Sequence, residues 1–151
     1  MHLQEIKVLL ADDDIDDCLF FKRALKELDI VTHLIAVHDG EQLMHLLLNE
    51  TTLLPDILFL DLNMPRKNGL ECLLEIKLNE KLKTLPVIVF STSFEQEVVN
   101  GLYQHGAHYF IRKPPGFLQF KKIIQHSLGL VSRDNFLRPG RENFVLTIQN
   151  D

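Results

Sequence analysis

Residues 57–65 read ILFLDLNMP, and this stretch decides the fold. An unbroken apolar run from Ile57 to Leu60 ends at an acid, Asp61. Continuous rather than alternating apolar residues are typical of a strand that is buried on both faces of a parallel sheet. Because a buried carboxylate without a partner is costly, Asp61 requires a partner at the end of this strand.

Similar apolar runs recur along the chain and alternate with stretches of helical period. The runs predict strands at residues 6–11, 33–37, 57–62, 87–91 and 109–111. Helices are expected between and after them, the last three at about 70–81, 95–105 and 117–128. This alternation, with connections long enough for crossovers, predicts an α/β fold with an open, doubly wound parallel sheet.

The length and composition fit one globular domain. The chain has 151 residues, of which 46% are hydrophobic and 25% are charged. The alternation of strands and helices weakens after Leu130, so we expect one domain over residues 1–130 and a tail over residues 131–151. The tail contains one short alternating run, Phe144–Ile148, which predicts one small element at most and no output domain.

Charge, apolar run lengths and cysteine usage exclude several classes of function. The net charge is −5 and the basic residues are scattered, so we expect no direct nucleic-acid partner. No apolar run approaches the roughly 18 residues of a membrane span, which predicts no contact with a membrane interior. Cys18 and Cys72 lack metal-ligand spacing and suit a reducing compartment, so we expect a cytoplasmic protein.

Polar side chains stand at the ends of four of the predicted strands. Asp12 and Asp13 follow the first strand, Asp61 follows the third run of apolar residues, Ser91 ends the fourth strand, and Lys113 follows the fifth. In an open α/β sheet, ligands bind outside the carboxyl ends of the strands. We therefore expect these side chains to converge on one rim of the sheet.

Carboxylates that lie this close repel one another unless a cation neutralises them. Mg²⁺ prefers oxygen ligands, and Asp13 and Asp61, with Asp12 acting through water, can supply the protein's share. The same ion would offset charge on a phosphoryl group during an in-line transfer. Asp61 would be the nucleophile that forms an acyl phosphate, while Lys113 and Ser91 would contact the phosphoryl oxygens.

Two structural interpretations compete with this chemistry. Asp12, Asp13 and Asp14 could be the acidic start of a helix, because carboxylates favour that end. Asp61 and Lys113 could form a purely structural ion pair. The coincidence of all four strand ends favours the phosphoryl site over the ion pair.

From about Ile6 to Leu128 the chain resembles the receiver domain of two-component response regulators. The resemblance rests on four motifs in combination: the acidic pair at 12–13, the block from Pro55 through Asp61 to Gly69, the run PVIVFS at 86–91, and the segment from Gly106-Ala107 to Lys113-Pro114. It implies a flavodoxin-like fold, with a five-stranded parallel sheet in the order 2-1-3-4-5 and five helices.

The resemblance also implies a role for each residue of the acidic site. Asp61 corresponds to the phospho-acceptor, Asp13 to a direct metal ligand and Asp12 to a ligand that acts through water. The backbone carbonyl of Asn63 corresponds to a third ligand, and the implied cofactor is Mg²⁺.

The remaining implied roles concern the response to phosphorylation. Ser91 corresponds to the switch hydroxyl and Lys113 to the phosphate-binding lysine, whose bond to Pro114 would be cis. Phe110 occupies the place of an aromatic that swings inward when the hydroxyl is drawn to the phosphate. Tyr109 is its neighbour, and strand alternation decides which of the two faces inward. Pro115 departs from the family pattern.

The implied function is a single-domain response regulator that takes a phosphoryl group on Asp61 from a sensor histidine kinase or a hybrid kinase, as the receivers paired with phytochrome-like kinases do. It would signal through protein contacts or a phosphorelay, as a signalling protein rather than an enzyme, and a homodimer is plausible. A phosphatase with an aspartyl-phosphate intermediate is disfavoured, because Asn63 stands where such enzymes place a second carboxylate. An unphosphorylated scaffold ranks lower, because the acidic site is complete.

Overall fold

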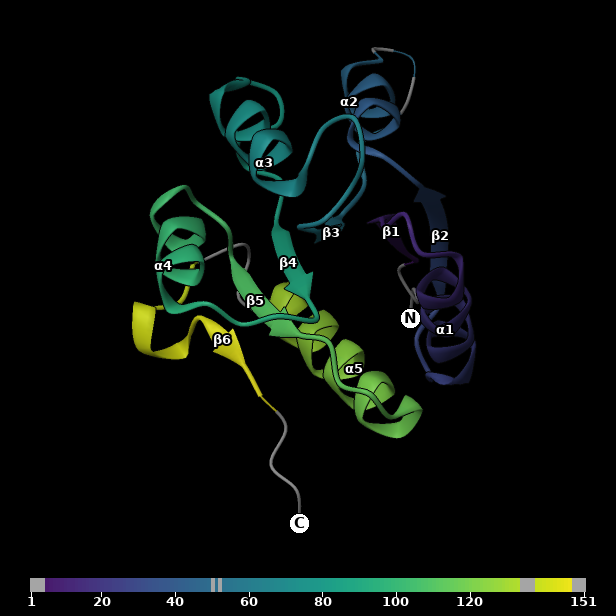
Figure 1. Ribbon diagram of the computed structural model, residues 1–151. Helices are drawn as coiled ribbons and strands as arrows, with labels where there is room; N and C mark the ends of the chain where they lie inside the picture. The colour runs from purple at the N-terminus through teal and green to yellow at the C-terminus, as the bar shows by residue number, and fades with distance from the viewer. Residues whose placement is uncertain (1–4, 50, 52, 134–137, 148–151) are drawn as a thin grey trace.

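The computed structural model describes residues 5–49, 51, 53–133 and 138–147. Strands and helices alternate through most of this length (Figure 1). The strands are β1 (Ile6–Ala11), β2 (Thr32–Val37), β3 (Ile57–Asp61), β4 (Val87–Ser91), β5 (Tyr109–Arg112) and β6 (Val145–Leu146). The helices are α1 (Ile15–Glu27), α2 (Gly40–Leu48), α3 (Gly69–Leu78), α4 (Gln96–Gln104) and α5 (Phe117–Arg133), and a short 3₁₀ turn, η1, covers Arg141–Asn143.

All strands pair in parallel in one sheet, in the order β2-β1-β3-β4-β5-β6. The predicted order 2-1-3-4-5, the five α-helices and the flavodoxin-like fold are confirmed. The prediction of five strands was one short, because β6 from the tail adds a sixth beside β5. The division of the chain at residue 130 stays a prediction.

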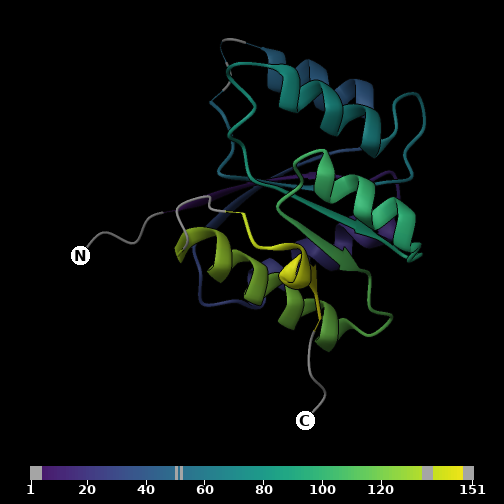
Figure 2. The ribbon, with the colours of Figure 1, turned by 90° about the vertical axis from the view of Figure 1, so that its left-hand side faces the viewer.

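Helices cover both faces of the sheet, so the molecule has three layers (Figure 2). The helices α1 and α5 pack on one face, where Phe21 and Phe59 meet edge to face. The helices α2, α3 and α4 pack on the other face, around side chains such as Leu58 and Leu73. Every residue of β3 and β4 is buried, as their continuous apolar sequences predict.

The helix starts explain how the sequence turns away from the sheet after a strand. The side chain of Asp14 caps α1 by accepting hydrogen bonds from the backbone N–H groups of Asp16 and Asp17, at 2.9 and 3.2 Å. Asp39 caps α2 in the same way, and Asn68 forms a capping box with Glu71 at the start of α3. Asp14 and Asp39 thus start a helix within three residues of the end of a strand.

Some helix ends and one peptide bond differ from the sequence-based expectations. The helix predicted at about 70–81 ends at Leu78. The helix predicted at 117–128 continues to Arg133. The Lys113-Pro114 bond is not cis, because the described residues contain no cis peptide bond, so that expectation was wrong. Within the described residues, no helix combines the length and apolar character needed to span a membrane.

Candidate functional site

The carboxyl ends of β1 and β3 bring the predicted acids together. Asp12 and Asp61 are buried and Asp13 is exposed. One ligand atom from each of these three residues lies within 4.8 Å of the others. The sequence-based prediction that the strand ends converge is therefore met at β1 and β3.

Lys113 follows β5 and reaches the same acids. Its Nζ lies 3.1 Å from Oδ2 of Asp12 and 3.7 Å from Oδ2 of Asp61, and its side chain is only 8% exposed. The ammonium also lies 4.5 Å from the centre of the Phe90 ring, a favourable cation–π position. A buried ammonium held among carboxylates is placed to contact anionic oxygen atoms on Asp61.

A fourth acid, Asp17 of α1, also contacts Lys113, with Oδ2 2.7 Å from Nζ. Sequence patterns alone do not single out this residue. Its only signal was its place five residues after Asp12, in the first turn of the helix that follows β1. Acids are common in that turn whatever the function, so the pattern gave no reason to single it out.

The electrostatic balance of the site is set mainly by burial. Burial raises the pKa of Asp61 to about 7; the charge of Lys113 lowers it in part, and the neighbouring Asp12 raises it further. Burial also raises the pKa of Asp12, although hydrogen bonding from the Asp14 N–H and attraction to Lys113 oppose the rise. Burial opposes the charge of Lys113, but Asp17, Asp12 and Asp61 together outweigh this and raise its pKa.

These residues fit a hard divalent cation. The donor set consists of carboxylate oxygens, which Mg²⁺, Mn²⁺ and Ca²⁺ all accept. Among the described residues, Lys113 supplies the ammonium that faces the buried acids, and its charge offsets only part of the rise that burial causes in the pKa of Asp61. The Asn63 N–H donates to Oδ1 of Asp61 at 3.3 Å, which places Asn63 beside the cluster. Metal coordination by the Asn63 carbonyl stays a prediction.

The geometry bears on both competing structural interpretations. The helix start is served by Asp14, whose side chain caps α1, whereas Asp12 is fully buried and contacts Lys113. The Asp61–Lys113 contact at 3.7 Å is the longest of the three ion pairs that Lys113 makes. A purely structural pair would be expected to close to hydrogen-bond distance.

Ser91 ends β4, the strand next to β3, and Phe110 lies on β5, the strand after that. The Ser91 hydroxyl is buried and lies 3.3 Å from Oγ of Ser93. Phe110 is buried on the sheet face that α4 covers, where its ring meets that of Phe94 edge to face at 5.9 Å, and Tyr109 is buried on the opposite face. Because side chains alternate along the strand, Tyr109 and Phe110 are both buried, on opposite faces of the sheet. The switch roles of Ser91 and Phe110 stay predictions.

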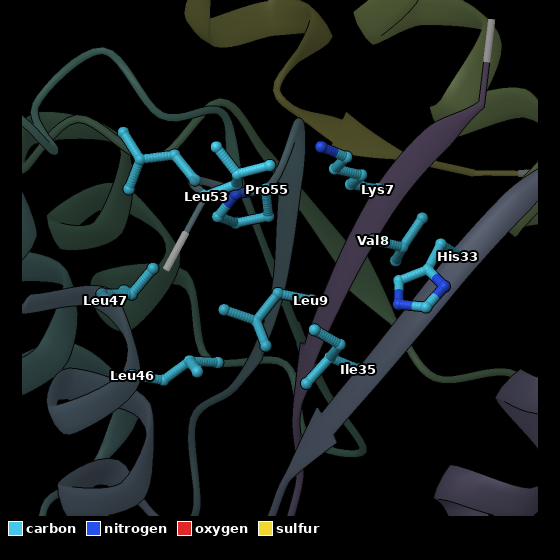
Figure 3. A pocket seen from close by; sticks show the side chains of 10 residues that line it. Lys7, Val8, Leu9, His33, Ile35, Leu46, Leu47, Leu53 and Pro55 are labelled. Atoms are coloured by element: carbon cyan, nitrogen blue, oxygen red, sulfur yellow. The ribbon is translucent and has the colours of Figure 1, made fainter. Parts of the chain in front are cut away.

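A second hollow lies toward the amino ends of β1 and β2 and has a volume of about 220 Å³ (Figure 3). Leu9, Ile35, Leu46 and Leu47 line it from the two strands and from α2. In the part of the chain that the structure describes, no carboxylate or thiol lines it, and the acidic cluster lies at the opposite, carboxyl end of β1.

The fold and the acid cluster together define a receiver-type signalling domain. Residues 8–125 match the family model of the response regulator receiver domain, and the chain belongs to this family. The response regulator Rcp1 of Synechocystis sp. is 33% identical over 122 residues, which cover 78% of this chain and 83% of Rcp1. The probable chemotaxis protein CheY of Rhizobium etli is 27% identical over 126 residues, covering 83% of this chain and 95% of that protein.

Solved structures agree with this assignment. The Mn²⁺-bound form of Rcp1 superposes with a TM-score of 0.77 at 29% identity, covering 89% of this chain and 99% of that chain. The phosphorylated cyanobacterial phytochrome response regulator RcpA gives a TM-score of 0.80 at 28% identity, covering 91% of this chain and 100% of RcpA. This chain is therefore similar over nearly its whole length to phytochrome response regulators.

Proposed function

We propose that this chain is a single-domain response regulator that accepts a phosphoryl group on Asp61. The observation that carries the proposal is the meeting of Asp12, Asp61 and Lys113, all with side chains at most 8% exposed, at the carboxyl rim of the sheet. Burial leaves the carboxylate of Asp61 poorly solvated, so its charge needs nearby cations. Lys113 and a divalent metal at this rim would compensate both that charge and the charge of a phosphoryl group added to it.

Mg²⁺ is the proposed cofactor, held by Asp13, by Asp61, by the Asn63 carbonyl and by Asp12 through water. When bound, it would supply positive charge that offsets the negative charge developing in the transfer. The acidic cluster and the Mn²⁺-bound form of Rcp1 support a divalent metal here. Mg²⁺ is chosen among the hard cations because it is usually bound by one or two carboxylates together with the phosphate of a substrate.

The donor is proposed to be a phosphohistidine of a sensor histidine kinase or a hybrid kinase. An Oδ atom of Asp61 attacks phosphorus, a P–O bond forms as the P–N bond breaks, and the electron pair leaves with the imidazole nitrogen. Lys113 pairs with a phosphoryl oxygen and Ser91 donates its hydroxyl hydrogen to another. A phytochrome-like kinase is the favoured donor class, because Rcp1 and RcpA resemble this chain over most of its length.

The proposed output is a change of protein contacts on the α4-β5-α5 face, or transfer of the phosphoryl group onward. Ser91 and Phe110 would carry the change, since Ser91 ends β4, the strand next to β3, and Phe110 lies on β5 and packs against the α4 side of the sheet. Turnover on small phosphate esters is not part of the proposal, because Asn63 offers no second carboxylate to protonate a leaving group. A homodimer remains part of the proposal for the signalling form.

Intact-mass analysis after incubation with Mg²⁺ and acetyl phosphate tests the proposal. We expect the mass of one phosphoryl group to be added to the wild type and no addition to Asp61→Asn. Asp16→Asn is the matched control, because Asp16 is exposed in the same rim region but makes no contact with Lys113. Absence of an adduct in the folded wild type with acetyl phosphate and with phosphoramidate would rule the acceptor role out.

Replacement of Lys113 and of Ser91 tests the switch separately from the acceptor. Lys113→Ala and Ser91→Ala should each retain the adduct on Asp61, because neither residue is the nucleophile. In both variants the wild-type change in ¹H–¹⁵N NMR shifts of α4 and β5 on phosphorylation should be lost. A wild-type pattern of shifts in either variant would contradict the role given to that residue.

A further inference from the structure

The ammonium of Lys113 has three acidic neighbours, and the nearest of them is Asp17. The distances from Nζ are 2.7 Å to Asp17, 3.1 Å to Asp12 and 3.7 Å to Asp61. The contacts to Asp17 and Asp12 are hydrogen bonds, whereas the contact to Asp61 is an ion pair without one. The lysine is therefore drawn toward α1 and away from the proposed acceptor.

Helix-end electrostatics alone does not explain the position of Asp17. Asp16 and Asp17 both stand in the first turn of α1, where acids favour the positive end of the helix dipole. Asp16 is exposed and does not contact Lys113, whereas the side chain of Asp17 is 30% exposed and makes the shortest bond to its ammonium. Asp17 thus has a specific partner in the phosphoryl site, and Asp16 provides its natural control.

Lys113 and a divalent metal compete for the same carboxylate. A lysine ammonium has three hydrogens, and two of them are directed to Asp12 and Asp17. If Asp17 were absent, the ammonium would be free to close the 3.7 Å gap and form a hydrogen bond with Asp61. A metal would then have to displace a tighter ion pair before it could bind Asp61.

We propose that Asp17 is a positioning residue that holds Lys113 off Asp61 in the unphosphorylated protein and so keeps the acceptor carboxylate available to the divalent metal. The inference rests on the proposed function, because that function requires metal and lysine to act at the same carboxylate. When a phosphoryl group is added to Asp61, its oxygens lie closer to Lys113 than the carboxylate did, and the lysine exchanges Asp17 for them. Asp17 acts through Lys113 and touches neither metal nor phosphoryl group.

Isothermal titration of the unphosphorylated protein with Mg²⁺ tests the proposal. The Kd for Mg²⁺ is expected to rise about tenfold in Asp17→Asn, a typical size for coupling between charged groups in contact. It should rise less than about twofold in Asp16→Asn, which removes the same charge from the same helical turn. Asp17→Glu keeps the carboxylate and should restore most of the wild-type affinity. An unchanged Kd in Asp17→Asn overturns the proposal.

A double-mutant cycle with Lys113→Met separates positioning from simple loss of negative charge. If Asp17 acts by holding the lysine, Asp17→Asn should change the Kd less than about twofold once Lys113 is gone. An equal rise with and without Lys113 would show that Asp17 acts as a remote charge and would overturn the proposal. Circular dichroism establishes that each variant is folded before titration, and Asp17→Ser replaces Asp17→Asn if the latter does not fold.

The positioning role of Asp17 and the proposed function can be refuted separately. The cycle measures metal binding without any phospho-donor, whereas the acceptor role is tested by the mass of the adduct on Asp61. An adduct in the wild type without coupling between Asp17 and Lys113 overturns the positioning role and leaves the function intact. Coupling without any adduct supports the positioning of Lys113 at a metal site and overturns phosphoryl acceptance.

Discussion

Replacing Asp61 with Asn is expected to stabilise the metal-free protein, and to do so more at pH 8 than at pH 5. Burial raises the pKa of Asp61 from 3.8 to about 7. The folded protein therefore binds the carboxyl proton more tightly than the unfolded chain does. Stability that comes from the protonated form is fully present below pH 3.8 and is lost as the pH rises through about 7. Asn resembles the protonated acid at every pH and avoids this loss.

The size of the effect follows from the pKa of Asp61. At about 1.4 kcal/mol per pH unit, the rise from 3.8 to about 7 corresponds to about 4 kcal/mol of unfolding free energy. Somewhat more than half of this loss falls between pH 5 and pH 8. The side chain is 6% exposed, so screening by solvent is small. The advantage of Asp61→Asn should thus grow by about 2 kcal/mol between the two pH values, or roughly 5 °C in Tm.

Urea unfolding followed by circular dichroism, with EDTA present, measures this difference. Wild type, Asp61→Asn and Asp16→Asn are compared at pH 5 and pH 8. The exposed Asp16 serves as the control, whose replacement should change the unfolding free energy by less than about 0.5 kcal/mol at either pH. An advantage of Asp61→Asn that is the same at both pH values, or a loss of stability at pH 8, would refute the reasoning.

Three further predictions concern the metal, the close packing beside the acceptor and the tail. Mg²⁺ at about 100 times its Kd should raise the unfolding free energy of the wild type by about 2.7 kcal/mol at pH 8. The same Mg²⁺ concentration should raise the unfolding free energy of Asp61→Asn by less than half as much. Equal gains in urea titrations would contradict the role of Asp61 as a metal ligand. Gly69→Ala should destabilise the protein by about 1–3 kcal/mol, because the added Cβ would collide with the backbone carbonyl of Asp61. Gly101→Ala should instead stabilise it by up to about 1 kcal/mol, because there is open space around this helical position. Thermal unfolding measures both, and shifts of the same sign would contradict this prediction. Phe144→Ala should cost about 3–5 kcal/mol in urea unfolding, because the ring is fully buried and meets Tyr103 at 5.1 Å; a cost below about 1 kcal/mol would show that the tail adds little to the fold.

Local patterns in the sequence were sufficient for the parallel sheet and for the grouping of the acids with Lys113, whereas the strand order followed from the resemblance to receiver domains. Continuous apolar runs such as Ile57–Leu60 identify buried parallel strands, and the rule that ligands bind at their carboxyl ends places Asp12, Asp61 and Lys113 together. These inferences need no knowledge of how helices are tilted or which loop packs where. They depend only on which residue ends each strand.

The features that the sequence did not predict depend on long-range packing. The alternating run at 144–148 suggested a small element, but pairing of Val145 with Phe110 joins residues far apart in sequence, and no local pattern encodes that choice. The contact of Asp17 with Lys113 depends on the direction in which α1 leaves β1. The Asp14 cap helps to set that direction, but the direction cannot be read from the sequence pattern. A short strand and a single hydrogen bond are both too small to leave a periodic signal.

The burial of Asp61 sets two opposing requirements for the proposed transfer. The carboxylate must be charged to attack phosphorus, yet burial raises its pKa to about 7 and favours the neutral acid. Lys113 lowers the pKa, but at 3.7 Å, with its hydrogen bonds given to Asp12 and Asp17, it does so only in part. In the proposed transfer, a divalent metal at the same carboxylate would supply the remaining compensation. Formation of the charged acceptor would then depend on the metal, because Lys113 alone opposes the effect of burial only in part.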